Sequence, residues 1–376
     1  GEGRIFTFGN GCFGQLGHGK RRDKREPTSI RSLEDTNIVQ VSAGDYHTVL
    51  LGGDGQVYTF GMGVDGLLGH GATEDKLEPT MIKALGYTNI VQVAAGGSHT
   101  VLLDERGQVY TFGKGDDGRL GHGATENKLV PTMIESLEGR IILQVMAGGS
   151  HTVLLTSDGK VFTFGLGKNG QLGHGDTENK LVPTMIKSLK STNIVQVAGG
   201  ERHTVLLGSD GRVYTFGDGD GGRLGHGDQE NKRLPTMIES LKDTSIVQVA
   251  AREYHTVLLG CDGRVYTFGY GKYGKLGHGD EKNKLVPTVI EKDATGSPLA
   301  FIGPPPRVLV KVASKDAASA AGGGRGSSAK IGGKSASAKG SDKTGNVSAA
   351  LESAPEKSRE VKVSDLANKL GLTEDA

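Results

Sequence analysis

The tetrapeptide Leu-Gly-His-Gly returns at one fixed interval and constrains this chain more than any other feature. Successive copies are 52 residues apart (70 − 18 = 52), and a second histidine series, each member opening a His-Thr-Val-Leu-Leu run, keeps the same interval. The first series is His18, His70, His122, His174, His226 and His278, and the second is His47, His99, His151, His203 and His255. A fixed period of this length is typical of repeat proteins, whose units stack into one body.

Composition narrows the class of protein. A formal net charge of +1 favours neither nucleic acid nor a membrane surface as a partner. Cys12 and Cys261 occupy unrelated positions of the repeat and provide neither a disulfide framework nor a zinc spacing, which indicates an intracellular protein of the cytoplasm or nucleus. The chain contains no run of about 18 apolar residues, so the sequence predicts no membrane span. The first residue is glycine inside a strand pattern, which predicts a fragment of a longer protein.

Each repeat predicts four short strands. In one repeat these are residues 56–61, 77–82, 89–94 and 99–103, which are rich in β-branched and aromatic residues. An Asp-Gly turn, as in Ser157-Asp158-Gly159, joins His-Thr-Val-Leu-Leu to the following Val-Tyr-Thr-Phe and predicts a hairpin. Four antiparallel strands in about 50 residues are typical of a propeller blade.

The spacing predicts an all-β fold of five complete blades plus one partial or composite blade. Each blade is expected to begin at a Pro-Thr-Met-Ile strand and to end at the next Tyr-Thr-Phe strand. The expected ranges are 27–60, 79–112, 131–164, 183–216 and 235–268. The N-terminal strand 4–8 is predicted to close the ring by completing a sixth blade with 287–290, 299–302 and 307–312, because closure removes exposed edges.

The repeated motif resembles a known family. Val-Tyr-Thr-Phe-Gly-x-Gly-x-x-Gly-x-Leu-Gly-His-Gly, Pro-Thr-x-Ile and Ile-Val-Gln-Val-Ala-Ala-Gly-x-x-His-Thr-Val-Leu-Leu are similar to the regulator of chromosome condensation repeat over about residues 3–291. The resemblance implies a β-propeller, usually of seven blades. Residues 1–312 are therefore predicted to form the propeller, and both six and seven blades are compatible with the sequence.

The sequence disfavours two chemical alternatives, a dinucleotide site and a metal site. Gly-x-Gly-x-x-Gly occurs six times, but a dinucleotide site needs a helix directly after the motif, and here a Leu-Gly-His-Gly loop and a Pro-Thr strand follow. The histidines stand alone in each repeat, without carboxylate or cysteine at ligand spacing. We predict that the histidines are buried and donate to backbone carbonyls of glycine-rich corners. No catalytic residue, metal, cofactor or small-molecule substrate is predicted.

The variable positions between constant glycines predict a partner-binding face. The Ala-Gly-x-x-His loop and the Gly-x-Gly-x-x-Gly loop leave a four-stranded blade from the same edge, and their tips differ from repeat to repeat. A constant frame with variable tips suits recognition; drift at exposed positions is the alternative. The predicted face comprises Asp45, Tyr46, His47, Ser98, Ser150, Glu201, Arg202, His203, Arg252, Glu253, Tyr254, His255, Phe13, Asp65, Asp116, Lys168, Asp220 and Tyr273.

The resemblance implies three functions. The Ran exchange factor of this family contacts its GTPase through acidic and histidine residues of the Gly-x-x-His loops, matched here by Asp45, His47, Glu201, His203, Glu253 and His255. Its β-wedge insertion has no counterpart, since the repeats are equal in length, and the tryptophans of the photoreceptor-like members are missing, since the chain has no Trp. The leading prediction is a non-enzymatic protein-interaction scaffold. The alternatives are an exchange factor for a Ran-like GTPase, or the substrate-binding part of a HECT-type ubiquitin ligase.

The remaining residues differ in composition. Residues 313–360 are rich in Ala, Gly, Ser and Lys, which predicts a disordered linker. Its lysines weakly suggest contact with chromatin or nucleic acid, while a solvated linker is the simpler interpretation. In 361–376, a helix start at Ser364, a stop at Gly371, and Leu366 and Leu370 on one face predict a short docking helix.

Overall fold

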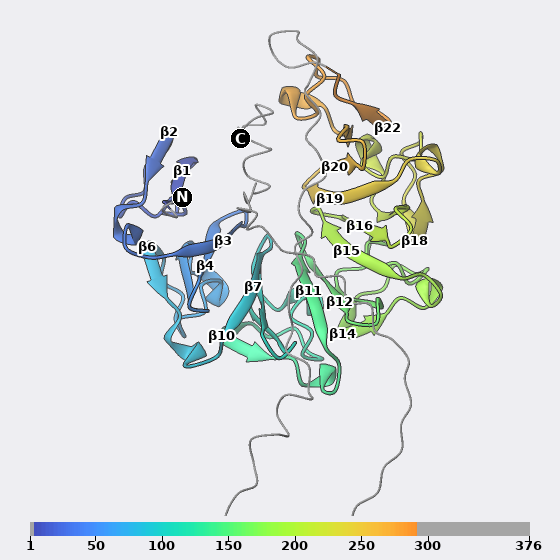
Figure 1. The fold of residues 1–376 in the computed structure, drawn as a ribbon. Coiled ribbons are helices and arrows are strands. Elements are labelled where there is room, and N and C mark those ends of the chain that lie inside the picture. The colour runs from blue at the N-terminus through green and yellow to red at the C-terminus, as the bar shows by residue number, and fades with distance from the viewer. Residues whose placement is uncertain (1–3, 292–376) are drawn as a thin grey trace, which may run out of the picture.

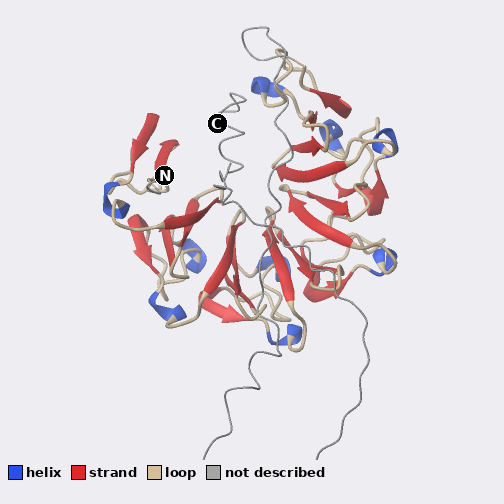
Figure 2. Cartoon of the chain, in the orientation of Figure 1, coloured by secondary structure: helices blue, strands red, loops and turns tan. Residues whose placement is uncertain are grey.

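The computed structural model describes residues 4–291, and it is an all-β propeller. A two-stranded sheet is followed by five four-stranded antiparallel sheets, giving six successive blades. Figure 1 shows the blades arranged around a common centre, with β3, β7, β11, β15 and β19 innermost and β6, β10, β14, β18 and β22 at the periphery. Figure 2 shows that the helices among the described residues are short turns outside the sheets, and each is a three-residue 3-10 helix.

The strands follow the repeat closely. The two-stranded blade is β1 (Phe6–Gly9) and β2 (Lys24–Ser29). The first strands of the five full blades are β3 (Ile38–Ala43), β7 (Ile90–Ala95), β11 (Ile142–Ala147), β15 (Ile194–Gly199) and β19 (Ile246–Arg252). The second strands are β4 (His47–Gly52), β8 (His99–Asp104), β12 (His151–Thr156), β16 (His203–Gly208) and β20 (His255–Gly260). The third strands are β5 (Val57–Gly61), β9 (Val109–Gly113), β13 (Val161–Gly165), β17 (Val213–Gly217) and β21 (Val265–Gly269). The fourth strands are β6 (Lys76–Met81), β10 (Lys128–Met133), β14 (Lys180–Met185), β18 (Lys232–Met237) and β22 (Lys284–Val289).

The 3-10 helices occupy two kinds of connection. Those that lead from one blade to the next are η1 (Arg31–Leu33), η3 (Lys83–Leu85), η5 (Glu135–Leu137), η6 (Lys187–Leu189) and η8 (Glu239–Leu241). Those in the loop between the third and fourth strands are η2 (Val64–Gly66), η4 (Asp116–Gly118), η7 (Asp220–Gly222) and η9 (Lys272–Gly274).

The predicted blade boundaries are wrong by one strand. The Pro-Thr-Met strand is the fourth strand of the preceding blade and not the first of the next: Thr80 pairs with Thr59, and Met81 pairs with Tyr58. The long loop between these strands folds back because the Asp75 carboxylate accepts the Gly63 N–H at 2.9 Å. The short link that follows, with buried Leu85 in η3, carries the chain to the next blade. The five full blades are therefore 38–81, 90–133, 142–185, 194–237 and 246–289.

The predicted ring closure is wrong for residues 287–290. Thr7 of β1 pairs with Thr28 of β2, and the Ile30 N–H donates to the Ile5 carbonyl. The Pro287 segment lies in β22, which pairs with β21 as the outer strand of its own blade. The predicted strands 299–302 and 307–312, the linker 313–360 and the helix 361–376 lie outside the described residues.

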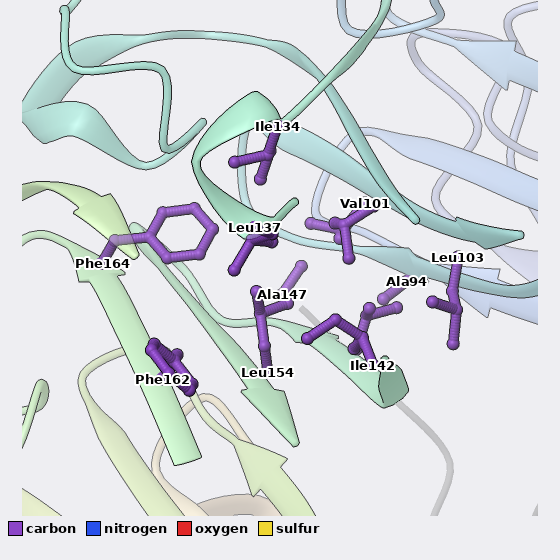
Figure 3. Close-up of a cluster of buried hydrophobic side chains, with 12 residues drawn as sticks. Ala94, Val101, Leu103, Ile134, Leu137, Ile142, Ala147, Leu154, Phe162 and Phe164 are labelled. Atoms are coloured by element: carbon purple, nitrogen blue, oxygen red, sulfur yellow. The ribbon is translucent and has the colours of Figure 1, made fainter. Parts of the chain in front are cut away.

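The apolar cores lie between neighbouring blades. Figure 3 shows Val101 of one blade and Ile134 of the link that follows it packed with Leu154 and Phe164 of the next blade. A Cβ on Gly121 would meet the Phe164 ring at 2.7 Å, and Gly121 has φ 79, so the Leu-Gly-His-Gly loop accepts only glycine at this contact. Burying such a side chain contributes about 1.5–3 kcal/mol, and each blade needs its neighbour to obtain that contribution.

Candidate protein-interaction face

The two variable loops of each blade lie side by side on one face of the propeller. The first connects the first and second strands, and the second connects the third and fourth. A backbone hydrogen bond joins them, as from the Met62 N–H to the Tyr46 carbonyl at 2.9 Å. The same bond recurs from Lys114 to Ser98, Leu166 to Ser150, Asp218 to Arg202 and Tyr270 to Tyr254. We call the surface formed by these loops the loop face.

The second histidine series holds neighbouring blades together beneath this face. Nε2 of His151 lies 2.9 Å from Oγ1 of Thr204 in the next blade, and that hydroxyl donates to the Gln171 carbonyl at 2.8 Å. The hydroxyl has one proton, so the ring nitrogen is the donor in the first bond. The same ring-to-hydroxyl contact joins His47 to Thr100, His99 to Thr152 and His203 to Thr256.

The first histidine series uses the same chemistry within each blade. The Thr163 hydroxyl donates to the Leu172 carbonyl at 2.7 Å and lies 2.9 Å from Nε2 of His174. Equivalent pairs anchor His18, His70, His122, His226 and His278. A threonine hydroxyl thus stands between Nε2 and the carbonyl. The prediction that the histidines bond to the backbone holds in part, because the backbone of the same threonine also bonds to the ring at His18, His70, His174, His226 and His278.

Burial keeps these rings neutral. Desolvation lowers the pKa of His151 to about 4, assisted by the positive charge of Arg119. It also lowers the pKa of His47 to about 3, assisted by Arg252, and the pKa of His255 to about 4, assisted by Lys275 and Arg252. In the Leu-Gly-His-Gly series, burial and Lys128 lower the pKa of His122 to about 4. His47, His122 and His151 are thus neutral rings that each contact a threonine hydroxyl, and they act as structural elements of the fold.

The structure places the predicted face residues at different depths. Exposed on the loop face are Asp45, Tyr46, Asp116, Lys168, Arg202, Asp220 and Tyr273. Partly exposed are Phe13, Asp65, Ser98, Ser150, Glu201, Arg252, Glu253, Tyr254 and His255. His47 and His203 are buried, so a partner on this face would meet the acids and aromatics and not these two rings.

One repeat departs from the glycine frame. Gly96 lies against its own histidine, since a Cβ there would be 2.7 Å from the His99 ring, and the equivalent position in the fifth full blade is Arg252. Arg252 reaches across the propeller centre to the first full blade, where Nη1 donates to the Ala43 carbonyl at 2.8 Å and Nη2 lies 3.9 Å from the Asp45 carboxylate. The arginine thus ties together two blades that are far apart in the sequence.

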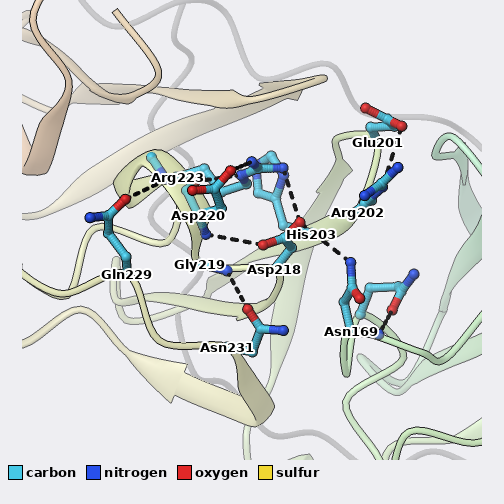
Figure 4. Close-up of polar contacts among 12 residues, drawn as sticks. Asn169, Glu201, Arg202, His203, Asp218, Gly219, Asp220, Arg223, Gln229 and Asn231 are labelled. Atoms are coloured by element: carbon cyan, nitrogen blue, oxygen red, sulfur yellow. Dashed lines mark hydrogen bonds and ion pairs between the residues drawn. The ribbon is translucent and has the colours of Figure 1, made fainter.

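A polar network stiffens the loop face at the fourth full blade (Figure 4). Arg223 is only 3% exposed, and its guanidinium lies 3.5 Å from Asp218 while Nε donates to the Asp220 carbonyl at 2.8 Å. Asn231 accepts the Gly219 N–H at 3.0 Å. A buried charge with these partners fixes the loop tips in place.

Sequence reasoning missed the Asn or Asp that supports every Gly-x-Gly-x-x-Gly loop. Its side-chain oxygen accepts the N–H of the middle glycine. The series is Asp23, Asp75, Asn127, Asn179, Asn231 and Asn283. These residues recur every 52 positions, and that spacing would have been enough to find them in the sequence. The loop is a within-blade connection, and over the described residues the motif is followed by irregular loop and a strand.

Among residues 4–291, no group of three or more His, Cys, Asp or Glu side chains is arranged to hold a metal ion. None of the helices in that range has the length and apolar character needed to cross a membrane.

Comparison with known proteins matches the fold and the repeat. Residues 1–313 match the model of the RCC1-like domain. The ultraviolet-B receptor UVR8 of Arabidopsis thaliana is 38% identical over 287 residues, which cover 76% of this chain and 65% of the receptor. The human E3 ubiquitin-protein ligase HERC2 is 35% identical over 295 residues, 77% of this chain and 6% of the ligase. The chain thus spans less than two thirds of the length of these relatives.

A solved structure supports the same assignment. Prp20p from Saccharomyces cerevisiae, whose structure was described with its binding properties to Gsp1p and histones, superposes with a TM-score of 0.69 at 27% identity. The match covers 78% of this chain and 74% of Prp20p. Because the family model matches residues 1–313, which are most of the chain, the chain belongs to the RCC1-like domain family.

Proposed function

We propose that this propeller is a non-enzymatic scaffold that binds a protein partner on its loop face. The observation that carries the proposal is the contrast within that face. Its frame of glycines, histidines and threonines repeats from blade to blade, while the side chains at the tips change from Ser98 and Ser150 to Arg202 and Tyr254. A rigid scaffold that displays varied tips on one side is suited to recognition.

The polar groups of the face support a protein partner. Asp45, Glu201 and Glu253 project from three different blades, and Arg202 and Lys275 form ion pairs with Glu201 at 3.4 Å and Glu253 at 3.9 Å. Interfaces between proteins are rich in aromatic residues and arginine. The two relatives named above are a receptor and a ligase, and the propeller occupies part of each.

The test is partner capture with two matched triple variants. The first changes Asp45, Glu201 and Glu253 on the loop face to Ala. The second changes Asp35, Glu135 and Glu239, three exposed acids on the opposite edge of the blades, to Ala and so removes the same charge. Each full-length variant is used to capture partners from an extract of cells that express the protein. We expect the first variant to lose partners that wild type and the second variant retain; equal capture by both variants would contradict the proposal.

A second candidate is nucleotide exchange on a Ran-like GTPase. It is favoured by the three loop-face carboxylates and by the likeness to Prp20p, whose structure was described with its binding to Gsp1p. The assay is release of fluorescent GDP from a Ran-type GTPase with and without this protein. Acceleration that is lost in the Asp45, Glu201 and Glu253 variant supports exchange, and an unchanged rate leaves the scaffold proposal alone.

A further inference from the structure

The loop face of the fifth full blade carries three tyrosines, which sets it apart from the other four. Tyr254, Tyr270 and Tyr273 occupy tip positions that are filled by other residue types in most repeats. Counterparts of Tyr254 are Tyr46, Ser98, Ser150 and Arg202; of Tyr270, Met62, Lys114, Leu166 and Asp218; of Tyr273, Asp65, Asp117, Asn169 and Gly221. The aromatic side chains are therefore a local feature of this blade and not part of the repeat frame.

Cations alternate with these rings. The Lys272 ammonium lies 4.7 Å from the Tyr273 ring, and Lys275 lies 5.9 Å from Tyr273 and 5.8 Å from Tyr254. The Arg223 guanidinium of the preceding blade lies over the Tyr254 ring, 5.0 Å from its centroid. Tyr270 meets Tyr254 edge to face at 6.2 Å. We call Tyr254, Tyr270, Tyr273, Lys272 and Lys275 the tyrosine–lysine patch.

The backbone at Tyr273 shows that the patch carries a structural cost. Its φ is 63, in the left-handed region that disfavours a bulky side chain. The equivalent Asp65 and Asp117 have φ 60 and 61, which aspartate tolerates better than tyrosine does, and the equivalent Gly221 with φ 67 bears no such penalty. A non-glycine residue in this region costs about 1 kcal/mol or more. Tyr273 is nevertheless 57% exposed, so its ring does not recover that cost by burial in the core.

The charge of the patch indicates what it binds. At the loop tips of this blade, residues 252–254 and 270–275, Arg252, Lys272 and Lys275 against Glu253 give a net charge of +2 (three cations minus one acid). The equivalent tips of the first full blade, residues 44–46 and 62–67, carry −2 from Asp45 and Asp65. Within residues 4–291, Lys272 forms no ion pair with a carboxylate. Exposed rings held between ammonium groups offer apolar contact and positive charge together.

We propose that the tyrosine–lysine patch docks an acidic segment of the protein partner, with carboxylates on Lys272 and Lys275 and apolar side chains on the tyrosines. This rests on the proposed function and assigns a blade and a chemistry to it. Glu253 lies 3.9 Å from Lys275, and Glu201 stands beside the Tyr254 hydroxyl, whose pKa it raises. An evenly charged nucleic-acid backbone would meet both carboxylates, whereas a peptide can place its acids at the lysines.

The test uses a defined probe and the full chain. A fluorescein-labelled dodecapeptide of Glu, Phe and Gly is titrated by fluorescence anisotropy against a matched peptide with Gln in place of each Glu, and against an oligo-dT strand of the same length. The variants are Lys272→Gln with Lys275→Gln, and Tyr273→Gly, which places at this position the residue of the fourth blade with the same backbone conformation. The control is Lys168→Gln, two repeats before Lys272 (272 − 168 = 104) on the same face.

We expect the acidic peptide to bind at least about tenfold more tightly than the Gln peptide, and each patch variant to remove about tenfold of that affinity. The Lys168→Gln control should bind as wild type does. Absent binding, equal binding of the two peptides, or an equal loss in Lys168→Gln would overturn the proposal, and tighter binding of oligo-dT would replace it with a nucleic-acid site. If the lysine variant captures partners normally while the Asp45, Glu201 and Glu253 variant does not, the patch fails and the scaffold function stands.

Discussion

Equivalent residues in the middle and at the beginning of the described arc have different surroundings. Val93, on the first strand of an interior blade, is 2% exposed, and Val41, one repeat earlier, is 46% exposed. Phe164 is fully buried, whereas Phe8, three repeats earlier on β1, is 37% exposed. The residue types and spacing are the same, so the difference comes from the neighbouring blade. Val93 packs against Val49 and Leu51 of the preceding blade, and among the described residues the blade of β1 has only its two outer strands.

The polar contacts show the same dependence. Gln92 exchanges two hydrogen bonds with the backbone of Val145 in the next blade, at 3.2 and 2.9 Å. His151 reaches forward to Thr204 in the same way. Each contact joins a blade to its successor, so an interior blade is held from both sides. A blade of this propeller is therefore half of two interfaces, and its stability depends on position in the array.

The largest effect is expected from removing the same phenylalanine in the two settings. Phe164→Ala should lower the free energy of unfolding by about 3–5 kcal/mol, because it empties the core between two blades. Phe8→Ala should cost much less, because its ring is already partly in water. Urea unfolding followed by circular dichroism measures both. Equal losses would show that position in the array does not matter.

The interior histidines should make stability fall with acid. Burial lowers the folded pKa of His151 to about 4, below the unfolded value near 6.5, so the unfolded chain takes up the proton first. The neutral His151 ring therefore contributes to the free energy of unfolding in full above pH 6.5. That contribution, at most roughly 3 kcal/mol, is lost as the pH falls from 6.5 to about 4. Unfolding midpoints across that range measure the loss.

Ring titration by NMR distinguishes the interior from the end. The pKa of His18 is also lowered by burial, but its ring is more accessible. We expect His18 to become protonated at a higher pH than His151. If the two rings titrated at the same pH, burial between blades would not be the cause of the lowered pKa of His151.

A third comparison uses the threonine hydroxyl. Thr204 accepts from His151 and donates to the Gln171 carbonyl, so Thr204→Val leaves two buried polar groups without partners and should cost about 1–3 kcal/mol. Thr48 at the beginning of the arc donates to the Gln15 carbonyl, and no described histidine donates to it. Thr48→Val should therefore cost less. The two variants are compared by thermal unfolding, and a larger loss for Thr48→Val would contradict the scheme.

The period alone was enough to predict a propeller with equivalent blades, and the Asp-Gly turn gave the central hairpin correctly. Which four consecutive strands form one blade was not predictable from the same signals. The Pro-Thr-Met strand can pair in antiparallel fashion with the strand before it or the strand after it, and no turn motif marks the loop that decides between them. The contact that decides is Asp75 with the Gly63 N–H, which a side chain makes across a folded loop.

The loop face was predictable even though the predicted blade boundaries were wrong. Two strands separate the two variable loops in both the predicted and the observed grouping of strands, so the loops leave from the same edge. The depth of its residues was not predictable in the same way. A histidine beside a variable tip has the same spacing whether it points outward or inward, and Thr100 and Thr152 one repeat further on decide that His47 and His99 point inward.

The smallest effect should come from restoring the repeat at Arg252. Arg252→Gly removes the hydrogen bond to Ala43 and the 3.9 Å ion pair to Asp45, both partly exposed, so the loss of stability should stay below about 1 kcal/mol. The charge of Arg252 also lowers the pKa values of His47 and His255, so both should rise in the variant. Arg202→Ala, an exposed arginine on the neighbouring blade, serves as the control and should leave His47 unchanged. A rise in the His255 pKa without one in that of His47 would show that Arg252 does not span the centre in solution, because His47 belongs to the blade on the far side of that contact.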